Sequence, residues 1–164
     1  MKNLFVVRHA KSSWESAFVN DHDRPLNARG MSDAPEMAQR LANAGFTIGK
    51  ICSSSARRAF TTAEFFAEAL GFEKKDIQVI AELYHAPPSE FWKQARQLPA
   101  TVSSAIFFSH NPGITLFANE TGVLRIDNMP TCSVLGISFN AAEWKQISPE
   151  NANLLHFDYP KKAD

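Results

Sequence analysis

Short, almost continuously apolar runs alternate along this chain with longer amphipathic stretches. The two strongest runs, Leu4 to Val7 and 104–108, are rich in β-branched or aromatic residues. Runs of this kind are typical of strands that are buried on both faces. Weaker runs predict further strands at 46–53, at 77–80 and at 134–139, with faint strand signals from Trp144 onward.

The amphipathic stretches repeat their apolar residues at helical spacing. The first is expected to run from Ala28 to Ala44, with an inner face formed by Ala34, Met37, Ala38, Leu41 and Ala44. Asn27 has the side chain of a helix cap, and Pro35 is tolerated only near the first turns of a helix. Further helices are predicted at 55–70, at 87–98 and over a short segment that ends near Glu120.

Strands and helices therefore alternate along the chain. This order predicts an α/β fold, a three-layer α/β/α sandwich with a mostly parallel central sheet. A length of 164 residues suits one domain with a real hydrophobic core, and no repeat or linker divides the sequence. We therefore expect a single domain over residues 1–164.

A long polar segment, 10–27, separates the first predicted strand from the first helix. Loops of this length inside a compact domain are usually functional. We expect Trp14 and Phe18 to anchor this loop to the body of the protein. His22 is expected to be solvated, with a substrate contact as the alternative if the loop folds over a site.

Charge and hydropathy narrow the range of partners. Lys plus Arg and Asp plus Glu each number 17, so the formal net charge is zero. This balance argues against non-specific binding to nucleic acid or to an anionic membrane. No apolar stretch approaches the roughly 20 residues of a membrane span. The chain enters a strand at once without a signal-peptide pattern, so we expect a cytoplasmic protein. We also expect a monomer.

Histidines and basic residues follow the two strongest strands directly. Arg8 and His9 end the first apolar run, and His110 follows the second, ahead of a Pro-Gly turn. The carboxyl ends of parallel strands meet at one edge of a sheet, where open α/β folds bind their ligands. We therefore expect His9 and His110 to face each other across a cleft. The alternative is that they are ordinary polar residues at strand ends.

A third polar cluster follows the strand at 46–53. Its serines, Ser53 to Ser55, are expected to cap a helix whose exposed N–H groups favour an anion. Helical periodicity separates the two arginines of the first turn, because Arg57 shares a polar face and Arg58 lies beside the buried stripe. An inward arginine needs an anionic partner. Arg58 is therefore the expected anion ligand.

Two histidines and two arginines at three strand ends indicate phosphoryl transfer. Arginine forks match phosphate oxygens, and fixed cations stabilise the charge that develops during transfer. A neutral histidine can attack phosphorus and hold it covalently. No His-x-His, His-Glu-x-x-His or clustered aspartate motif is present, so we expect neither a metal site nor a cofactor.

The combination of these motifs resembles the histidine phosphatase superfamily, which has the phosphoglycerate mutase-like fold. The resemblance is carried by Arg8-His9-Ala10, by Ser54-xxx-Arg58-Ala59-xx-Thr62 and by His110-Asn111-Pro112-Gly113. Within the superfamily the chain is most similar to the small branch typified by the phosphohistidine phosphatase SixA. That similarity also covers the segments 8–12, 23–27, 83–86 and 128–131.

The resemblance implies a role for each matching residue. His9 would be the nucleophile that becomes phosphorylated, and the phosphoryl oxygens would be bound by Arg8, Arg58 and His110. Further substrate contacts are expected from Lys11, Ser12 and Asn111, with a solvated loop position as the alternative for the first two.

The resemblance also implies a metal-independent phosphatase whose product is inorganic phosphate. Protein phosphohistidine is the expected substrate, because its P–N bond is labile and the short chain leaves little material for a lid over the site. The alternatives are a phosphatase for a small phosphate ester and a non-catalytic module that binds phosphate or phosphoproteins. The proton donor stays open between Glu82, Tyr84, His85 and none, and Glu90 is no better placed.

Overall fold

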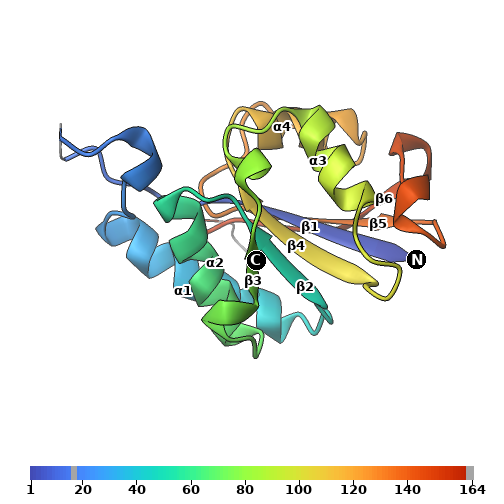
Figure 1. Cartoon of the computed structure of the whole chain (residues 1–164), viewed down its shortest axis with the longest axis horizontal. Helices are drawn as coiled ribbons and strands as arrows, with labels where there is room; N and C mark the ends of the chain where they lie inside the picture. The colour runs from blue at the N-terminus through green and yellow to red at the C-terminus, as the bar shows by residue number, and fades with distance from the viewer. Residues whose placement is uncertain (16–17, 162–164) are drawn as a thin grey trace.

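A computed structural model describes residues 1–15 and 18–161 of the chain. Its centre is a six-stranded sheet with the strand order β3-β2-β4-β1-β5-β6 (Figure 1). The strands are β1 (Lys2–Arg8), β2 (Lys50–Ser53), β3 (Ile77–Val79), β4 (Ser104–Ser109), β5 (Val134–Phe139) and β6 (Ala152–Asp158). All the predicted strands are present, and the faint signals near the C-terminus correspond to β6.

Helices cover both faces of this sheet. They are α1 (Ala28–Asn43), α2 (Arg57–Ala69), α3 (Pro88–Arg96) and α4 (Gly113–Glu120). In Figure 1, α1 and α2 lie on one side of the sheet, and α3 and α4 lie on the other. The predicted three-layer α/β/α sandwich is therefore confirmed. In the described ranges, no helix is long and apolar enough to cross a membrane.

The strand directions bring several chain segments to one edge of the sheet. β1 runs parallel to β4, and β2 runs parallel to both β4 and β3. β5 is antiparallel to β1 and to β6, so one strand of the six is reversed and the sheet is mostly parallel, as predicted. The carboxyl ends of β1, β2 and β4 share an edge. The reversed strand begins at that same edge, so the segment that precedes Val134 reaches it too.

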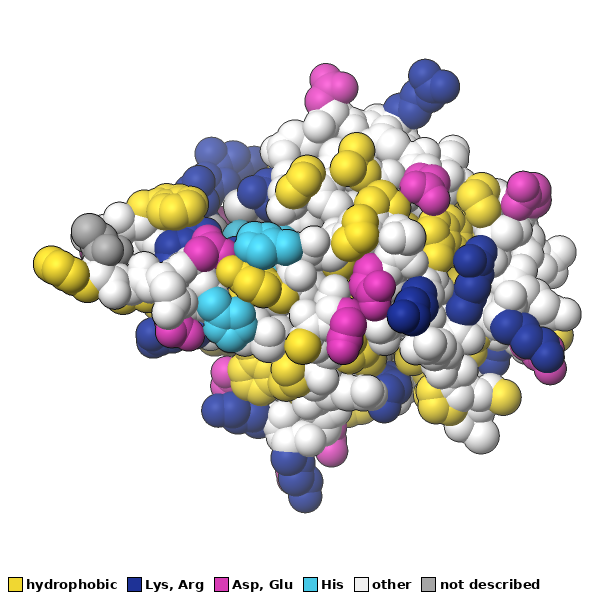
Figure 2. Space-filling model, turned by 45° about the horizontal axis from the view of Figure 1, so that its top comes forward, with side chains coloured by type: hydrophobic (Ala, Val, Ile, Leu, Met, Phe, Trp, Pro, Cys, Tyr) yellow, Lys and Arg dark blue, Asp and Glu magenta, His cyan; other side chains and the backbone are white. Residues whose placement is uncertain are grey.

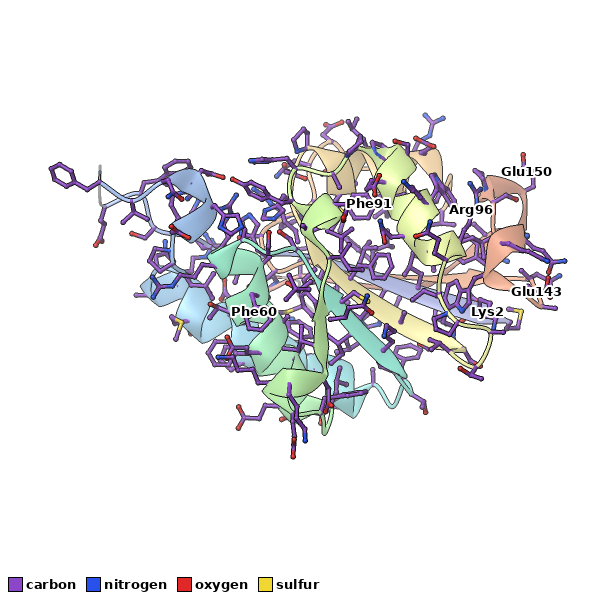
Figure 3. The ribbon with its side chains drawn as sticks, in the orientation of Figure 1. Lys2, Phe60, Phe91, Arg96, Glu143 and Glu150 are labelled. Atoms are coloured by element: carbon purple, nitrogen blue, oxygen red, sulfur yellow. The ribbon has the colours of Figure 1, made fainter. Side chains whose placement is uncertain are left out.

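The continuous apolar run of β1 is explained by burial on both faces. Leu4 and Val6 belong to the hydrophobic cluster that contains α3 and α4 residues. Phe5 and Val7 belong to the cluster on the side of α1 and α2. Since successive side chains of a strand point to opposite faces, both sets must be apolar. Figure 3 shows Phe91 of α3 lying between its helix and the sheet, where it is fully buried.

α1 begins and packs as its sequence predicts. The Asn27 side chain accepts a hydrogen bond from the backbone N–H of Gly30 at 2.9 Å. The prediction for Pro35 was wrong, because this proline lies well inside the helix. Pro35 and Met31, the residue four positions earlier, are both exposed. Water can therefore hydrate the carbonyl that loses its helical hydrogen bond, and the helix continues.

The boundaries of β2 and α2 differ from the prediction. β2 starts at Lys50 rather than at residue 46, although Ile48 is buried as an inward residue should be. α2 starts at Arg57, and its N-cap is Ala56, which has no side-chain cap bond. The serine-cap prediction was wrong because Ser54 accepts from the Ala56 N–H at 3.1 Å within the preceding turn.

Candidate active site

A cavity of about 230 Å³ lies at the carboxyl edge of the sheet. Side chains from the ends of β1 and β4, from α2 and from the loop before α1 line it. These residues are Arg8, His9, Lys11, Ser12, Trp14, Asp21, Arg24, Arg58, His85, His110, Asn111 and Thr131. Figure 2 shows histidine, cationic and acidic side chains gathered at the narrow end of the molecule that carries the loop.

His9 is held in one tautomer by its own backbone neighbourhood. It follows β1, and its Nδ1 lies 2.7 Å from the carbonyl oxygen of Ala10. A carbonyl can only accept, so Nδ1 carries the proton and the neutral ring has its lone pair on Nε2. The Ala10 N–H donates to the Thr62 hydroxyl at 3.0 Å. This bond ties the end of β1 to α2.

The environment of His9 favours the neutral ring. Burial lowers the pKa of His9 to about 3, and the positive charges of Arg58, Arg8 and Arg24 lower it in the same direction, against the bond to Ala10. At neutral pH the imidazole is therefore uncharged. A neutral, buried histidine with a free Nε2 lone pair has the properties of a nucleophile.

His110 lies beside His9, as predicted from the two strand ends. The ring centroids are 5.2 Å apart. The Nε2 of His110 is 2.7 Å from the Ser54 hydroxyl, which also accepts from the Ala56 N–H. The hydroxyl proton is then available to Nε2, which leaves a proton on Nδ1. Burial, followed by the electrostatic influence of the neighbouring His9 ring and of the Arg58 guanidinium, lowers the pKa of His110 to about 2, so this ring is neutral as well.

Three buried nitrogen atoms on cavity-lining residues have no hydrogen-bond partner in the part of the chain that the structure describes. They are Nε of Arg8, Nε of Arg58 and Nδ1 of His110. Arg8 is otherwise held by a bond from Nη1 to the Met129 carbonyl at 2.8 Å. Leaving a buried donor unpaired costs free energy. An oxyanion in the cavity would supply acceptors for all three residues.

The two arginines at the start of α2 separate as helical periodicity predicts. Arg57 is exposed, and Arg58 is 3% exposed. Arg58 donates from Nη1 to the Asp21 carbonyl at 2.7 Å and from Nη2 to the Asp21 carboxylate at 3.0 Å. The anionic partner that an inward arginine requires is therefore a residue of the loop before α1.

Asp21 is a site residue that sequence reasoning missed, as are the cavity-lining residues Trp14, Arg24 and Thr131. Its carboxylate accepts from the Tyr84 hydroxyl at 2.5 Å, and it lies 3.4 Å from Nε2 of His85 and 3.1 Å from Nη2 of Arg24. Partial burial opposes ionisation, but the Tyr84 bond and the two guanidinium groups hold the pKa of Asp21 well below its usual range. Its position in a loop with no hydrophobic periodicity left no signal to find it.

The other three predicted substrate contacts line the cavity, and two of them, Ser12 and Asn111, already have protein partners. The Ser12 hydroxyl accepts from Nη1 of Arg24 at 2.6 Å. The Asn111 side chain bonds to Asn128 and accepts from Thr115 at 2.5 Å. Lys11 is exposed at the cavity. Ser12 and Asn111 therefore hold neighbouring segments in place.

The structure shows which of the candidate proton donors after β3 line the cavity. Glu82 is exposed and does not line the cavity, Tyr84 is bonded to Asp21, and His85 lines the cavity. His22 does not line it, and its Nε2 is 2.9 Å from the Ser55 hydroxyl.

The predicted role of two aromatic residues as loop anchors was wrong. Trp14 is 74% exposed and Phe18 is 99% exposed. The loop is held instead by polar contacts, chiefly those of Asp21 with α2.

The first half of the chain matches a known protein family. The model of the histidine phosphatase superfamily (branch 1) matches residues 4–86, half of the chain. The chain belongs to the histidine phosphatase superfamily. The match includes β1 with His9 and the start of α2 with Arg58.

Two proteins of similar sequence match the chain to different extents. The uncharacterized protein ML1117 of Mycobacterium leprae is 28% identical over 166 residues, which cover 94% of this chain and 100% of that protein. The protein At3g52155 of Arabidopsis thaliana is 37% identical over 84 residues. This second match covers 51% of the chain and 38% of the plant protein.

Solved structures of SixA have the same fold over nearly the whole chain. The structure of SixA from Agrobacterium tumefaciens has a TM-score of 0.79 at 23% identity and covers 97% of this chain and 98% of its own. A structure of the protein histidine phosphatase SixA with tungstate has a TM-score of 0.75 at 19% identity. It covers 96% of this chain and 97% of its own. The fold is therefore phosphoglycerate mutase-like and of the small SixA type.

Proposed function

We propose that this protein is a metal-independent phosphatase that works through a phosphohistidine on His9. One observation carries the proposal: the bond from Nδ1 of His9 to the Ala10 carbonyl leaves the Nε2 lone pair of a neutral ring in a cavity with Arg8, Arg58 and His110. Membership of the histidine phosphatase superfamily supports phosphatase chemistry. We infer further that residues 1–164 act as one domain, because a single sheet carries both helical layers.

In the first step, Nε2 of His9 attacks the phosphorus atom of the substrate. The Nε2–P bond forms while the bond from phosphorus to the leaving atom breaks, and the leaving atom takes up a proton. His9 keeps the proton on Nδ1, so the phosphorylated ring carries a positive charge that the Ala10 carbonyl stabilises. Arg8, Arg58 and His110 donate to the equatorial oxygens, where charge spreads in the transition state.

In the second step, water attacks the phosphorus atom of the intermediate. The O–P bond forms, the Nε2–P bond breaks and the water loses one proton, which balances the proton taken up in the first step. Inorganic phosphate leaves, and His9 returns to its neutral tautomer. The positive charge that this chemistry requires is supplied by guanidinium groups, which makes activity in the presence of a chelator the expectation.

We infer that protein phosphohistidine is the substrate class. A structure of the same fold is named as a protein histidine phosphatase and was solved with tungstate, a tetrahedral oxyanion like phosphate. Lys11, Trp14 and His85 line the cavity and are exposed, so its rim is accessible to a residue on another protein. A small phosphate ester is the alternative substrate, to be tested in the same assay.

The deciding experiment compares wild type with His9→Ala in chelator, using a phosphohistidine peptide, p-nitrophenyl phosphate and a panel of metabolite phosphates. We expect the peptide to be preferred by orders of magnitude and the variant to be inactive. Rapid quenching of wild type should trap an acid-labile phosphoryl group that His9→Ala lacks. Full activity of the variant would refute the mechanism, whereas preference for a metabolite would change only the substrate. No turnover of any compound would favour a binding module.

A further inference from the structure

An exposed tryptophan stands at the rim of the cavity. Trp14 lines the cavity and is 74% exposed. The carbon atom at the centre of the Arg24 guanidinium lies 3.5 Å from the centre of its ring system. The tryptophan therefore lies flat against a cation in the wall of the site, and the mechanism above leaves it without a role.

The cation beneath Trp14 is rigidly held. Arg24 is 7% exposed, it donates from Nη1 to the Ser12 hydroxyl at 2.6 Å, and it donates from Nε to the Asp21 carboxylate at 3.2 Å. Ser12 is itself paired with Leu26 in a β-bridge. These contacts fix the plane of the guanidinium, and the guanidinium in turn fixes the plane of the indole through a cation–π contact.

This arrangement leaves one broad face of the indole available. Arg24 covers one face at contact distance, so most of the exposed surface must belong to the opposite face and the ring edge. A flat aromatic surface that is already oriented can stack on another planar ring with little loss of conformational entropy. Trp14 lines the same cavity as Arg58 and His110, so a leaving group that extends toward the rim from a phosphoryl group bound by those two residues can meet this surface.

We propose that Trp14 is a specificity-determining residue that stacks on a planar, aromatic leaving group, namely the imidazole ring of a phosphohistidine side chain. The inference rests on the proposed function, because it assigns the part of the substrate that lies outside the phosphoryl pocket. Stacking on Trp14 would distinguish between two substrates that have the same type of scissile bond. Phosphohistidine and phospholysine both contain a P–N bond, but only phosphohistidine presents a ring.

The first test is kinetic and uses two peptides of the same sequence, one with phosphohistidine and one with phospholysine. The variants are Trp14→Phe, which keeps a ring, Trp14→Leu, which keeps apolar bulk, and Leu154→Ala as a control. Leu154 is 52% exposed, lies on the edge strand β6 and does not line the cavity. Trp14→Leu should lower kcat/KM for the phosphohistidine peptide about tenfold, the range that aromatic stacking provides. The same variant should change phospholysine turnover by less than about twofold on this argument.

Trp14→Phe and Leu154→Ala should retain most of the activity on both peptides. Inhibition by tungstate should be unchanged in every variant, because the phosphoryl pocket is intact. An equal loss on both peptides in Trp14→Leu would overturn the inference, since it would show that Trp14 only supports Arg24. If wild type hydrolyses other phosphorylated compounds but not phosphohistidine, the proposed substrate class falls, and if it hydrolyses none of them, the proposed function falls. If wild type prefers phosphohistidine and Trp14→Leu does not alter that preference, the inference about Trp14 falls alone.

The second test measures binding without turnover. Of the three tryptophans in the sequence, Trp92 and Trp144 are 5% and 2% exposed, so quenching of fluorescence by acrylamide reports mainly on Trp14. In the His9→Ala protein, the phosphohistidine peptide should protect this fluorescence and the phospholysine peptide should not. The double variant His9→Ala/Trp14→Phe supplies the background. Equal protection by both peptides would contradict stacking. So would the absence of protection by either peptide at a concentration that saturates the site, with tungstate competition showing that the peptide is bound there.

Discussion

His85 lines the cavity, whereas Glu82 and Tyr84, the other two candidates for the proton donor, are not among its lining residues. The backbone of His85 has a φ of 54°, in the left-handed region that few non-glycine residues adopt. Its Nε2 faces the Asp21 carboxylate at 3.4 Å, and its ring lies 4.0 Å from that of Tyr84. His9 and His110 have pKa values too low for either ring to take up a second proton and become positively charged at neutral pH. His85 is exposed at the cavity and lies beside the Asp21 carboxylate, which is the placement that a general acid requires.

Replacing His85 should therefore affect substrates according to their leaving groups. The variant His85→Asn suits the test, because asparagine tolerates a positive φ. We expect kcat/KM for a phosphohistidine peptide to fall about 10²-fold, the low end of general acid catalysis. Turnover of p-nitrophenyl phosphate, whose leaving group departs without a proton, should change little. A uniform loss on both substrates would argue for a structural role of His85.

At the scale of secondary structure, α2 decides which of two adjacent arginines serves the site. Arg58 lies on the face that contains the buried residues Ala59, Thr62 and Phe66, and its guanidinium reaches Asp21. Arg57 is turned to solvent. The difference of one helical position is 100° of rotation, which is enough to separate a buried cation that lines the cavity from a cation on the surface.

Alanine substitutions at these two positions should give opposite results. Arg58→Ala should lower kcat by about 10²- to 10³-fold, as does removal of other preorganised donors of this type. Arg57→Ala should be nearly silent and is the matched control. Circular dichroism and steady-state kinetics on both variants measure the effect, and the reverse ranking would mean that the face of α2 has been misassigned.

Periodic elements could be predicted from the sequence, and the geometry of the loop could not. The spacing and composition of the apolar residues in β1 and α2 indicate which faces are buried. His9, Arg58 and the neighbouring His110 could therefore be placed from strand ends and helical spacing. The bond between Asp21 and Arg58 joins residues 37 positions apart, and no pattern in the loop records it. The prediction for Trp14 was wrong for the same reason. A loop tryptophan is expected to be buried, and the sequence does not show that Arg24 holds this one at the surface.

For the molecule as a whole, two buried histidines make stability depend on pH. In the folded protein the pKa of His9 is about 3 and that of His110 is about 2, whereas an unfolded histidine titrates near about 6.5. Below that pH the unfolded chain binds more protons than the folded one. The stabilising contribution is therefore present above about pH 6.5 and is lost as the pH falls toward the folded pKa values.

We expect the free energy of unfolding to fall by about 1.4 kcal/mol per pH unit for each of these two histidines between about pH 6 and pH 4. Urea denaturation at a series of pH values measures the slope. The variant His9→Gln should remove one histidine's share of it while leaving the other. A slope that is unchanged in His9→Gln would show that His9 is protonated in the folded protein.

The distribution of charge around the cavity has a consequence for how partners approach. Arg8, Lys11, Arg24 and Arg58 line the cavity with a single carboxylate, Asp21, among the residues described there, yet the chain as a whole has a formal net charge of zero. The remainder of the molecule must therefore carry an excess of negative charge, and the protein has a dipole moment whose positive pole is the active site. An anionic partner exerts a torque on such a molecule before contact and turns the cavity toward itself. Encounter should then be fast in dilute buffer and slow as added salt shortens the Debye length.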